Sequence, residues 1–340
     1  MLDFSCDYNV GAHEEVLRRL IETNFEKTAT YGLDVYSDSA REKIKVTCNA
    51  PLARVQFLVG GTQTNATVLS AILASFEGVI SAESGHIATH EAGAIEYTGH
   101  KVMTVPSHEG KIDPSVLLNF LLAYENDEVR EHTVKPGALY ISQPTEYGTV
   151  YSRSELEDIS KICREHNILL YIDGARLGYA LASECDLTLA DIARLADAFY
   201  IGGTKVGALF GEAVVITKPD LCPHFFSTVK QHGALLAKGR VLGVQFDTLF
   251  TDGLYLKISG NAVSAAMRLK AGLLKKGYEL YIDSPTNQQF VVVDNDALPG
   301  LRERVKLDVW EKPDDTHTVV RFVTSFATTE EEVDELLKIM

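Results

Sequence analysis

One lysine of this chain lies in a segment that otherwise holds glycine and apolar residues, Ile201-Gly-Gly-Thr-Lys-Val-Gly-Ala-Leu209. A lysine on a solvated surface does not need such neighbours. A lysine amine becomes nucleophilic near neutral pH when it is partly desolvated, as in enzymes that form a Schiff base with a carbonyl group. The segment therefore indicates Lys205 as a candidate Schiff-base lysine, and Thr204 beside it could offer a hydroxyl group to a phosphate.

An acidic residue ends the apolar run Leu169-Leu-Tyr-Ile-Asp-Gly-Ala-Arg176. A carboxylate at the end of a buried strand loses solvation unless it meets a cation or a strong hydrogen-bond donor. A protonated pyridine nitrogen is one such partner, because its bond to Asp173 would keep the ring charged and able to draw electrons. A carboxylate that only caps its own turn explains the same sequence equally well.

Two further segments carry chemistry-bearing side chains. Val59-Gly-Gly-Thr-Gln-Thr-Asn65 lies where a strand turns into a helix, and glycines with free helix amides suit a phosphate, although a plain tight turn gives the same pattern. His86 and His90 are four residues apart with Glu91 next, but a zinc-binding H-E-x-x-H motif needs the glutamate directly after the first histidine. We therefore expect no metal there, and a histidine that packs on a ring or in the core instead.

These residues must be positioned by an alternation of strands and helices. Near-continuous apolar runs predict strands that are covered on both faces of a mostly parallel sheet, with chemistry at their carboxyl ends. The capping pattern Ser154-Glu-Leu-Glu157 predicts the start of one helix, and another begins near Gln63. The predicted strands are Gln56–Val59, Gly78–Ala82, Ala138–Ser142, Ile168–Ile172, Ala198–Gly202 and Ala213–Ile216.

The alternation of short apolar runs with helices ends after about Gly243. A long amphipathic helix near Asn261–Lys276 comes before apolar runs at Phe290–Val293 and Val319–Val323 and a final acidic helix near Thr329–Met340. The chain is thus expected to be an α/β protein with a large domain over residues 1–243, whose N-terminal segment contributes to the active site, and a small C-terminal α+β domain over residues 244–340.

Composition limits the classes of partner. The chain has 340 residues and a net charge of −15, which disfavours nucleic acids and anionic membranes as partners. The five cysteines are scattered without a C-x-x-C pair, so neither a disulfide framework nor a zinc knuckle is expected. Neither a signal peptide nor a membrane span is visible, and a reducing cytoplasm is the expected location.

The order of these elements matters more than each one alone. A glycine turn, His86, Asp173 with Arg176 and then Lys205 follow one another along the chain. This order resembles the fold-type-I pyridoxal-phosphate enzymes, and specifically the short β-eliminating lyase group that contains low-specificity L-threonine aldolase. The resemblance covers nearly the whole chain and is carried by Gly61-Thr-Gln-Thr-Asn65, Gly85-His-Ile, Glu91-Ala-Gly93, Asp173-Gly-Ala-Arg176, Gly203-Thr-Lys205 and Arg321-Phe-Val-Thr-Ser325.

The resemblance implies a role for each matching residue. The implied cofactor-binding residues are Gly61, Thr62, Gln63, His86, Asp173, Arg176, Thr204 and Lys205, with Lys230 and Lys238 reaching the phosphate of a neighbouring subunit. The implied catalytic residues are Lys205, Asp173, His86 and His132, where His132 is matched to a second histidine of the family. The implied clamp on the substrate carboxylate consists of Ser5, Arg176 and Arg321, and Tyr31 is implied to lie near the substrate. A homo-oligomer with sites at the dimer interface, and a tetramer overall, follows from the same resemblance.

The implied reaction is the cleavage of L-threonine, L-allo-threonine or a related β-hydroxy-α-amino acid to glycine and an aldehyde, with pyridoxal phosphate as cofactor. The chain departs from the family at Ser142-Gln-Pro-Thr145, where threonine aldolases usually carry Glu-Asn-Thr-His, and at Gly-Gly-Thr-Lys205 in place of serine-lysine. A β-eliminating lyase, an aminotransferase, a racemase and a silent pyridoxal-phosphate-binding regulator therefore stay open as alternatives.

Overall fold

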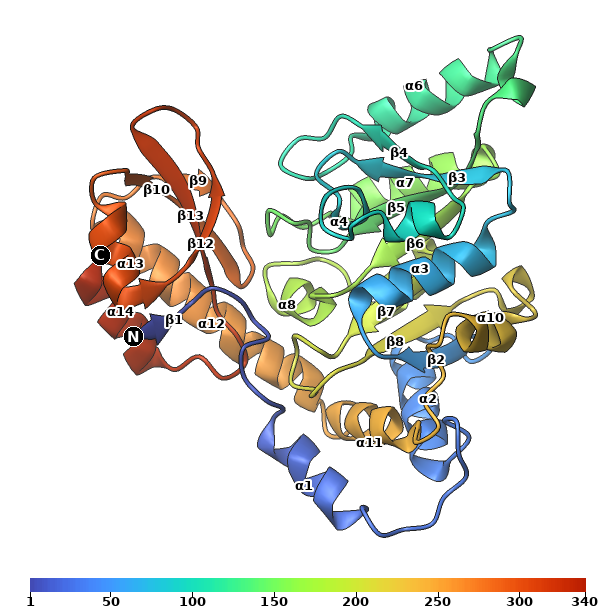
Figure 1. Ribbon diagram of the computed structural model, residues 1–340, viewed down its shortest axis with the longest axis horizontal. Coiled ribbons are helices and arrows are strands. Elements are labelled where there is room, and N and C mark those ends of the chain that lie inside the picture. Colours follow the sequence, from blue (N-terminus) through green and yellow to red (C-terminus); the bar gives the residue numbers. More distant parts are fainter.

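Apolar runs between residues 54 and 216 form neighbouring strands of one sheet in the computed structural model, which describes residues 1–340 (Figure 1). The seven strands lie in the order β2-β8-β7-β6-β5-β3-β4, and all pairs are parallel except those that β8 makes with β2 and β7. Their bounds are β2 (Arg54–Leu58), β3 (Glu77–Ala82), β4 (Val102–Val105), β5 (Lys135–Ser142), β6 (Leu169–Asp173), β7 (Ala198–Gly202) and β8 (Glu212–Ile216). The predicted mostly parallel sheet is confirmed, and β4 is an additional edge strand.

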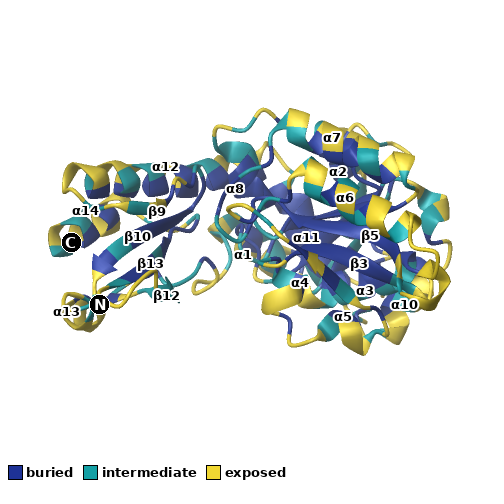
Figure 2. Ribbon diagram, turned by 90° about the horizontal axis from the view of Figure 1, so that it is seen from above, coloured by how far each residue is buried: buried dark blue, intermediate teal, exposed yellow.

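Successive residues of each strand point to opposite faces, so the sheet separates two cores. On β5, Leu139 and Ile141 belong to one core, whereas Ala138 and Tyr140 belong to the other. Figure 2 shows helices on both faces. The first core is covered by α2 (Val35–Thr47), α6 (Pro114–Glu125), α7 (Arg153–Glu165) and α11 (Arg240–Leu249), the second by α3 (Gly61–Ile72), α5 (Ala94–Tyr97) and α10 (Phe225–Gln231).

The start of α7 differs from the prediction by two residues. Its capping box is formed by Ser152 and Glu155, not by Ser154 and Glu157. The sequence Ser152-Arg-Ser-Glu-Leu-Glu157 contains the same S-x-x-E pattern twice, so the local signal does not decide between them. The preceding residue, Tyr151, is buried and accepts a bond from the Ile112 amide, which fixes where the helix begins.

The smaller part is an antiparallel sheet in the order β12-β13-β10-β9, packed on helices. Its elements are β9 (Leu280–Ile282), β10 (Gln288–Asp294), α13 (Leu298–Arg304), β11 (Val305–Lys306), β12 (Asp308–Glu311), β13 (His317–Val323) and α14 (Glu330–Ile339). The long helix α12 (Leu254–Lys275) joins it to the larger part (Figure 1). The remaining elements are β1 (Leu2–Asp3), α1 (Glu14–Glu22), α4 (His86–Thr89), α8 (Leu177–Ala182) and α9 (Leu189–Leu195).

Residue 243, at which the division between the two parts was expected, lies inside α11. Along α12, Val263 belongs to the large core, whereas Ala265 belongs to the core of the small part. The first residues of the chain also join the small part, since β1 pairs in parallel with β11 and Phe4 packs in its core. We therefore propose that the division runs through the middle of α12. None of the helices combines the length and apolar composition needed to cross a membrane.

Candidate active site

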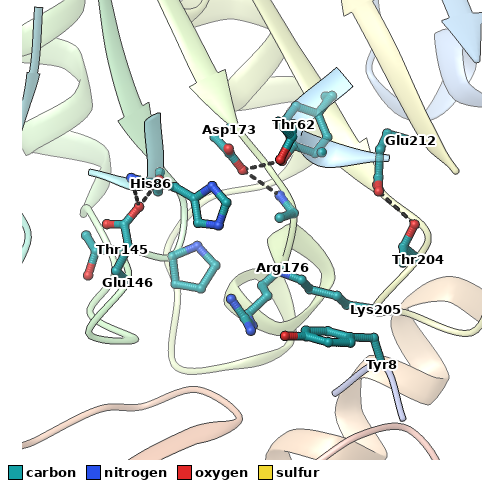
Figure 3. Close-up of a pocket in the computed structure, with 15 residues that line it drawn as sticks. Tyr8, Thr62, His86, Thr145, Glu146, Asp173, Arg176, Thr204, Lys205 and Glu212 are labelled. Atoms are coloured by element: carbon teal, nitrogen blue, oxygen red, sulfur yellow. Dashed lines mark hydrogen bonds between the residues drawn. The ribbon is translucent and has the colours of Figure 1, made fainter. Parts of the chain in front are cut away.

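The carboxyl ends of β5, β6 and β7 meet the amino ends of α3 and α4 around a cavity of about 290 Å³ (Figure 3). This is the edge at which parallel α/β sheets bind ligands. Its lining includes Tyr8, Gly61, Thr62, His86, Ser142, Glu146, Asp173, Arg176, Tyr200, Thr204, Lys205 and Glu212. The structure thus brings together, in one cavity, seven of the residues that the sequence indicated: Gly61, Thr62, His86, Asp173, Arg176, Thr204 and Lys205.

Asp173 ends β6 at the back of this cavity and is surrounded by donors. Its carboxylate accepts hydrogen bonds from the Tyr200 hydroxyl at 2.5 Å, the Tyr140 hydroxyl at 2.7 Å, the Asn65 amide at 3.0 Å and the Ala175 backbone at 3.0 Å. Burial by itself raises the pKa of this carboxyl, but the charge of His86 and the donated bonds outweigh it and lower the pKa. The site therefore holds a buried negative charge beside an open space.

His86 is held in place by a second buried carboxylate. Its Nδ1 lies 2.8 Å from Oε1 of Glu91, whose side chain is completely buried. The same oxygen accepts from Asn65 at 2.7 Å, and Asn65 also donates to Asp173. Asn65 thus links the two carboxylates, and the orientation of the His86 ring is fixed relative to Asp173.

Lys205 follows β7 and lines the cavity with its amine free of any ion pair in the protein. Burial, and then the positive charge of Arg176, lowers the pKa of Lys205 to about 8. The nearest aromatic ring is that of Tyr8, whose centroid lies 5.8 Å from Nζ. A desolvated amine of this kind has a large neutral fraction near pH 8, and the neutral amine is the nucleophile.

The amino end of α3 faces the cavity with Gly61 and Thr62. The helix has Gly60 at its N-cap with no side chain capping it, so the amides of its first turn are free to bind an anion. A Cβ atom on Gly61 would come within 3.2 Å of the Tyr200 hydroxyl, which explains the absence of a side chain there. Gln63 does not line the cavity; its Oε1 accepts from the Val59 amide at 3.3 Å.

The sequence suggested that the Thr204 hydroxyl could bind a phosphate, but in the structure this hydroxyl already has partners within the protein. Its hydroxyl donates to Oε1 of Glu212 at 2.8 Å and accepts from the Gly211 amide at 2.9 Å. Glu212 is buried, and burial raises its pKa to about 8, although the bonds from Thr204 and Gly203 oppose this. The hydroxyl is used within the protein because the buried carboxyl group needs a donor.

Arg176 stands at the mouth of the cavity and is paired with a residue of the N-terminal segment. Its Nε and Nη2 donate to the Asp7 carboxylate at 2.7 and 3.0 Å, and Asp7 also accepts from Asn287 at 2.9 Å. The Nη1 group makes no bond in the protein and is free for a ligand. The substrate role expected for Ser5 is not supported, because its hydroxyl donates to Asp3 at 2.6 Å and lines neither this cavity nor the next.

A second cavity of about 600 Å³ adjoins the first and reaches the small part. Both are lined by Tyr8, His86, Glu146, Arg176 and Lys205. From the small part come Arg321, which donates to Asp308 at 2.7 Å, and Trp310, whose ring centroid lies 4.8 Å from the guanidinium carbon. Burial, and then the positive charge of Arg176, lowers the pKa of Arg321.

Besides Gln63 and Ser5, four more of the expected site residues lie outside both cavities: Tyr31, His132, Lys230 and Lys238. Tyr31 lies beside Lys230, whose amine is 5.1 Å from its ring centroid, and its amide donates to the backbone of Ala237 next to Lys238. These three residues form one cluster, away from the cavities of their own chain. His132 is an exposed residue of a short 3₁₀ helix just before β5. It therefore lies at the amino-terminal ends of the parallel strands, whereas Asp173 lies at their carboxyl ends, and its catalytic assignment is corrected.

Several lining residues were missed from sequence. Tyr140 and Tyr200 are, from the sequence, only residues of predicted strands, and Glu212 directly precedes the predicted strand Ala213–Ile216. Asp7 and Tyr8 lie in a segment without periodicity. The one available signal was that three of the predicted buried strands carry a tyrosine, Tyr140, Tyr171 or Tyr200, whose hydroxyl group must find a partner when it is buried.

The cavity accommodates each part of a phosphorylated pyridine aldehyde. Lys205 offers a free amine to the aldehyde, Asp173 an ionised buried carboxylate to the ring nitrogen, and the first turn of α3 free amides to the phosphate. The residues present therefore fit pyridoxal phosphate.

Comparison with known proteins agrees with this geometry. A family model described as beta-eliminating lyase matches residues 3–302. The low specificity L-threonine aldolase of a Pseudomonas species is 31% identical over 310 residues, which is 88% of this chain and 87% of that protein. The threonine aldolase of Pseudomonas aeruginosa shows the same identity and coverage.

Two solved structures extend the comparison. The structure of Leishmania major threonine aldolase is 42% identical, with a TM-score of 0.96, and the match covers 100% of this chain and 98% of that one. The aspartate aminotransferase of Thermus thermophilus is 17% identical with a TM-score of 0.71 over 100% of this chain and 90% of that chain, a likeness of fold alone. The predicted fold-type-I architecture is confirmed.

Proposed function

The chain belongs to the β-eliminating lyase family, and we propose that it is a pyridoxal-phosphate-dependent aldehyde-lyase that cleaves β-hydroxy-α-amino acids to glycine and an aldehyde. L-threonine and L-allo-threonine are the proposed substrates, and acetaldehyde the proposed product. The observation that carries the proposal is the single cavity that holds Lys205, Asp173 and the amino end of α3 and that opens onto two arginines.

Each part of the cofactor has a proposed holder. Lys205 would hold its aldehyde carbon, Asp173 its ring nitrogen, His86 one face of the ring, and the amides of Gly61 and Thr62 its phosphate. When bound, pyridoxal phosphate supplies a sink for the electron pair left on the α-carbon of an amino acid. The chain's contribution is to keep Asp173 ionised, for which its four hydrogen-bond donors provide the physical reason.

The substrate carboxylate is proposed to bind between Arg176 and Arg321. Each guanidinium borders the second cavity, and each is already paired with one carboxylate, Asp7 or Asp308, which fixes its position. Both guanidinium groups line the second cavity, and the positive charge of Arg176 contributes, after burial, to the lowered pKa of Arg321. A planar guanidinium matches a carboxylate in a bidentate manner, so a pair of them selects an α-amino acid over a plain amine.

The function is tested by incubating the purified protein with pyridoxal phosphate and L-threonine and identifying the products. Glycine and acetaldehyde in equal amounts are expected. Formation of 2-oxobutyrate and ammonia would assign β-elimination instead, and a keto acid without ammonia would assign transamination. Bound cofactor with no product from a panel of amino acids would favour the non-catalytic regulator.

We further propose that the active protein is a homo-oligomer in which the cluster of Tyr31, Lys230 and Lys238 serves the site of a neighbouring subunit. Support comes from the position of this cluster outside its own cavities and from the strongly exposed Phe25 and Tyr97 side chains, 95% and 94% exposed. An inactive Lys205→Ala subunit mixed with a Lys230→Ala, Lys238→Ala subunit should regain part of the activity. A fully active monomer would contradict this.

A cytoplasmic location is proposed because all five cysteines are free, as is usual in a reducing compartment. Fractionation of cells that express the tagged chain would test this.

A further inference from the structure

Glu146 is a carboxylate between the two cavities that the roles above do not use. It follows β5 in the loop that begins at Gln143, and it lines both cavities. Figure 3 shows its side chain in the first of them. Its Oε1 accepts hydrogen bonds from the His86 amide at 2.8 Å and from the Ser142 hydroxyl at 2.6 Å. Its Oε2 has no donor in the protein and is not among the buried unpartnered atoms, so it is open to the cavity. One oxygen holds the group while the other faces the ligand space.

Three contacts in series connect Glu146 to Asp173. Glu146 and Ser142 lie 2.6 Å apart, Ser142 and Tyr140 lie 3.1 Å apart, and Tyr140 donates to Asp173 at 2.7 Å. Two hydroxyl groups supply only two protons for these three contacts. While Glu146 is ionised, one contact therefore lacks a proton. A proton taken up by Glu146 would supply the missing one, so that each of the three contacts becomes a hydrogen bond.

The pKa of Glu146 also favours its taking up a proton. Burial raises the pKa of Glu146; the bond from Ser142 opposes this, and the negative charge of Asp173 adds to it. A general acid–base group works best when its pKa lies near the operating pH, and a carboxyl group reaches that range only when its pKa is raised. The other charged or titratable groups that border the two cavities are Tyr8, His86, His90, Tyr147, Asp173, Arg176, Tyr200, Lys205, Glu212, Asp308, Glu311 and Arg321.

No histidine besides His86 and His90 borders either cavity, and His132 lies at the amino-terminal ends of the strands, away from the site. The Nδ1 atom of His86 is already paired with Glu91. A cleavage that produces an aldehyde nevertheless requires a group to receive the proton of the β-hydroxyl. Glu146 is the carboxylate that borders both the space at Lys205 and the space at the two arginines.

On the basis of the proposed function, we propose that Glu146 is a catalytic residue that takes the proton of the substrate's β-hydroxyl group as the Cα–Cβ bond breaks. The O–H bond breaks and its proton passes to Oε2, while the electron pair of that bond forms the carbonyl group of the aldehyde. The pair of the Cα–Cβ bond stays with Cα until a proton arrives there, which gives glycine. One proton leaves the substrate and one is gained, so no oxidant or reductant takes part.

The test compares two reactions of the same variant. Glu146→Gln keeps the shape of the side chain and an oxygen that accepts from His86 and Ser142, but it removes the base. Cleavage of L-threonine should fall by about 10²–10³-fold, within the usual contribution of a general base. Exchange of the glycine α-hydrogen with deuterium, followed by NMR, should be unchanged because glycine has no β-hydroxyl group. Binding of pyridoxal phosphate, followed by absorbance, should also be unchanged.

The matched control is Glu83→Gln, which removes a carboxylate at the end of β3 that lines neither cavity. This variant should cleave L-threonine like the wild type. Cleavage by the wild type should fall as the pH is lowered through the pKa of Glu146, since only the ionised carboxylate accepts a proton. Glu146→Asp should restore part of the activity and this pH dependence, whereas the residual activity of Glu146→Gln should lack it.

The outcomes separate the two proposals. Wild-type cleavage by Glu146→Gln, or a parallel loss of cleavage and glycine exchange in that variant, would overturn the role of Glu146 and leave the proposed function intact. A wild-type protein that neither exchanges glycine nor cleaves L-threonine would overturn the proposed function itself.

Discussion

The charged groups on the two sides of the ligand space are held in different ways. On the sheet side, Asp173 accepts bonds from Asn65, Tyr140 and Tyr200, all within the large part of the molecule. On the arginine side, Arg176 depends on Asp7, 169 positions away in sequence. Asp7 in turn is bonded to Asn287, 280 positions away, and Arg321 is paired with Asp308 on the next strand.

This difference separates two tasks. The sheet side keeps a buried charge ionised through hydroxyl and amide donors on one rigid sheet, which is the arrangement that stabilises developing charge without reorganisation. The arginine side joins the N-terminal segment, the large part and the small part through ion pairs. Changes on the sheet side should therefore alter the rate of reaction, and changes at Arg321 should alter substrate affinity.

The largest effect is expected at Lys205, where the two sides meet. Lys205→Ala should lower turnover by more than about 10³-fold, as the loss of a covalent nucleophile does. Borohydride reduction should no longer link the cofactor to the chain, which mass mapping of the peptides can show. The control is Lys257→Ala, an exposed lysine of α12, which should be labelled and active like the wild type. Labelling of another lysine in Lys205→Ala would refute the assignment.

On the sheet side, Asp173→Asn should fold normally but lose about 10²–10³-fold in turnover, because the neutral amide no longer stabilises a protonated ring nitrogen. Thermal unfolding and steady-state rates measured on the same preparation distinguish the two properties. Turnover close to that of the wild type would mean that Asp173 merely caps its turn and that the sheet side has no electronic role.

On the arginine side, Arg321→Ala should bind pyridoxal phosphate normally but need more substrate. The expected loss is about 10- to 100-fold in affinity for glycine or L-threonine, the value of a hydrogen bond to a charged group. Ethanolamine, which has no carboxylate, should bind equally to both proteins. Absorbance titrations of the bound cofactor measure these affinities, with Arg268→Ala on the surface as the control. Equal titrations for amino acids would remove Arg321 from the site.

The smallest effect concerns pH. Since burial and Arg176 lower the pKa of Lys205 to about 8, the neutral amine predominates above that pH. The rate at which the cofactor-free protein takes up pyridoxal phosphate should therefore fall by about tenfold for each pH unit below about 8, as expected for a single protonation. Stopped-flow absorbance would follow this step. A rate independent of pH between 6 and 9 would place the lysine pKa elsewhere.

The sequence alone determined six of the seven strands of the sheet, the candidate lysine and the carboxylate at the end of β6. β7 spans Ala198–Gly202 as predicted, and Lys205 and Asp173 line one cavity. These features could be predicted because they depend on residues close together in the chain: a buried strand needs a continuous apolar run, and a desolvated lysine needs small and apolar neighbours.

The tertiary structure alone decided which polar residues surround these two. Asp7 reaches Arg176, Tyr140 reaches Asp173, and Glu146 comes to lie at His86, 60 positions away. Conversely, His132 lies at the amino-terminal end of β5, and the length of this strand separates it from the site at the carboxyl end. Such positions leave no periodic signal, because a hydrogen bond depends on distances set by the packing of whole elements and not on spacing along the chain.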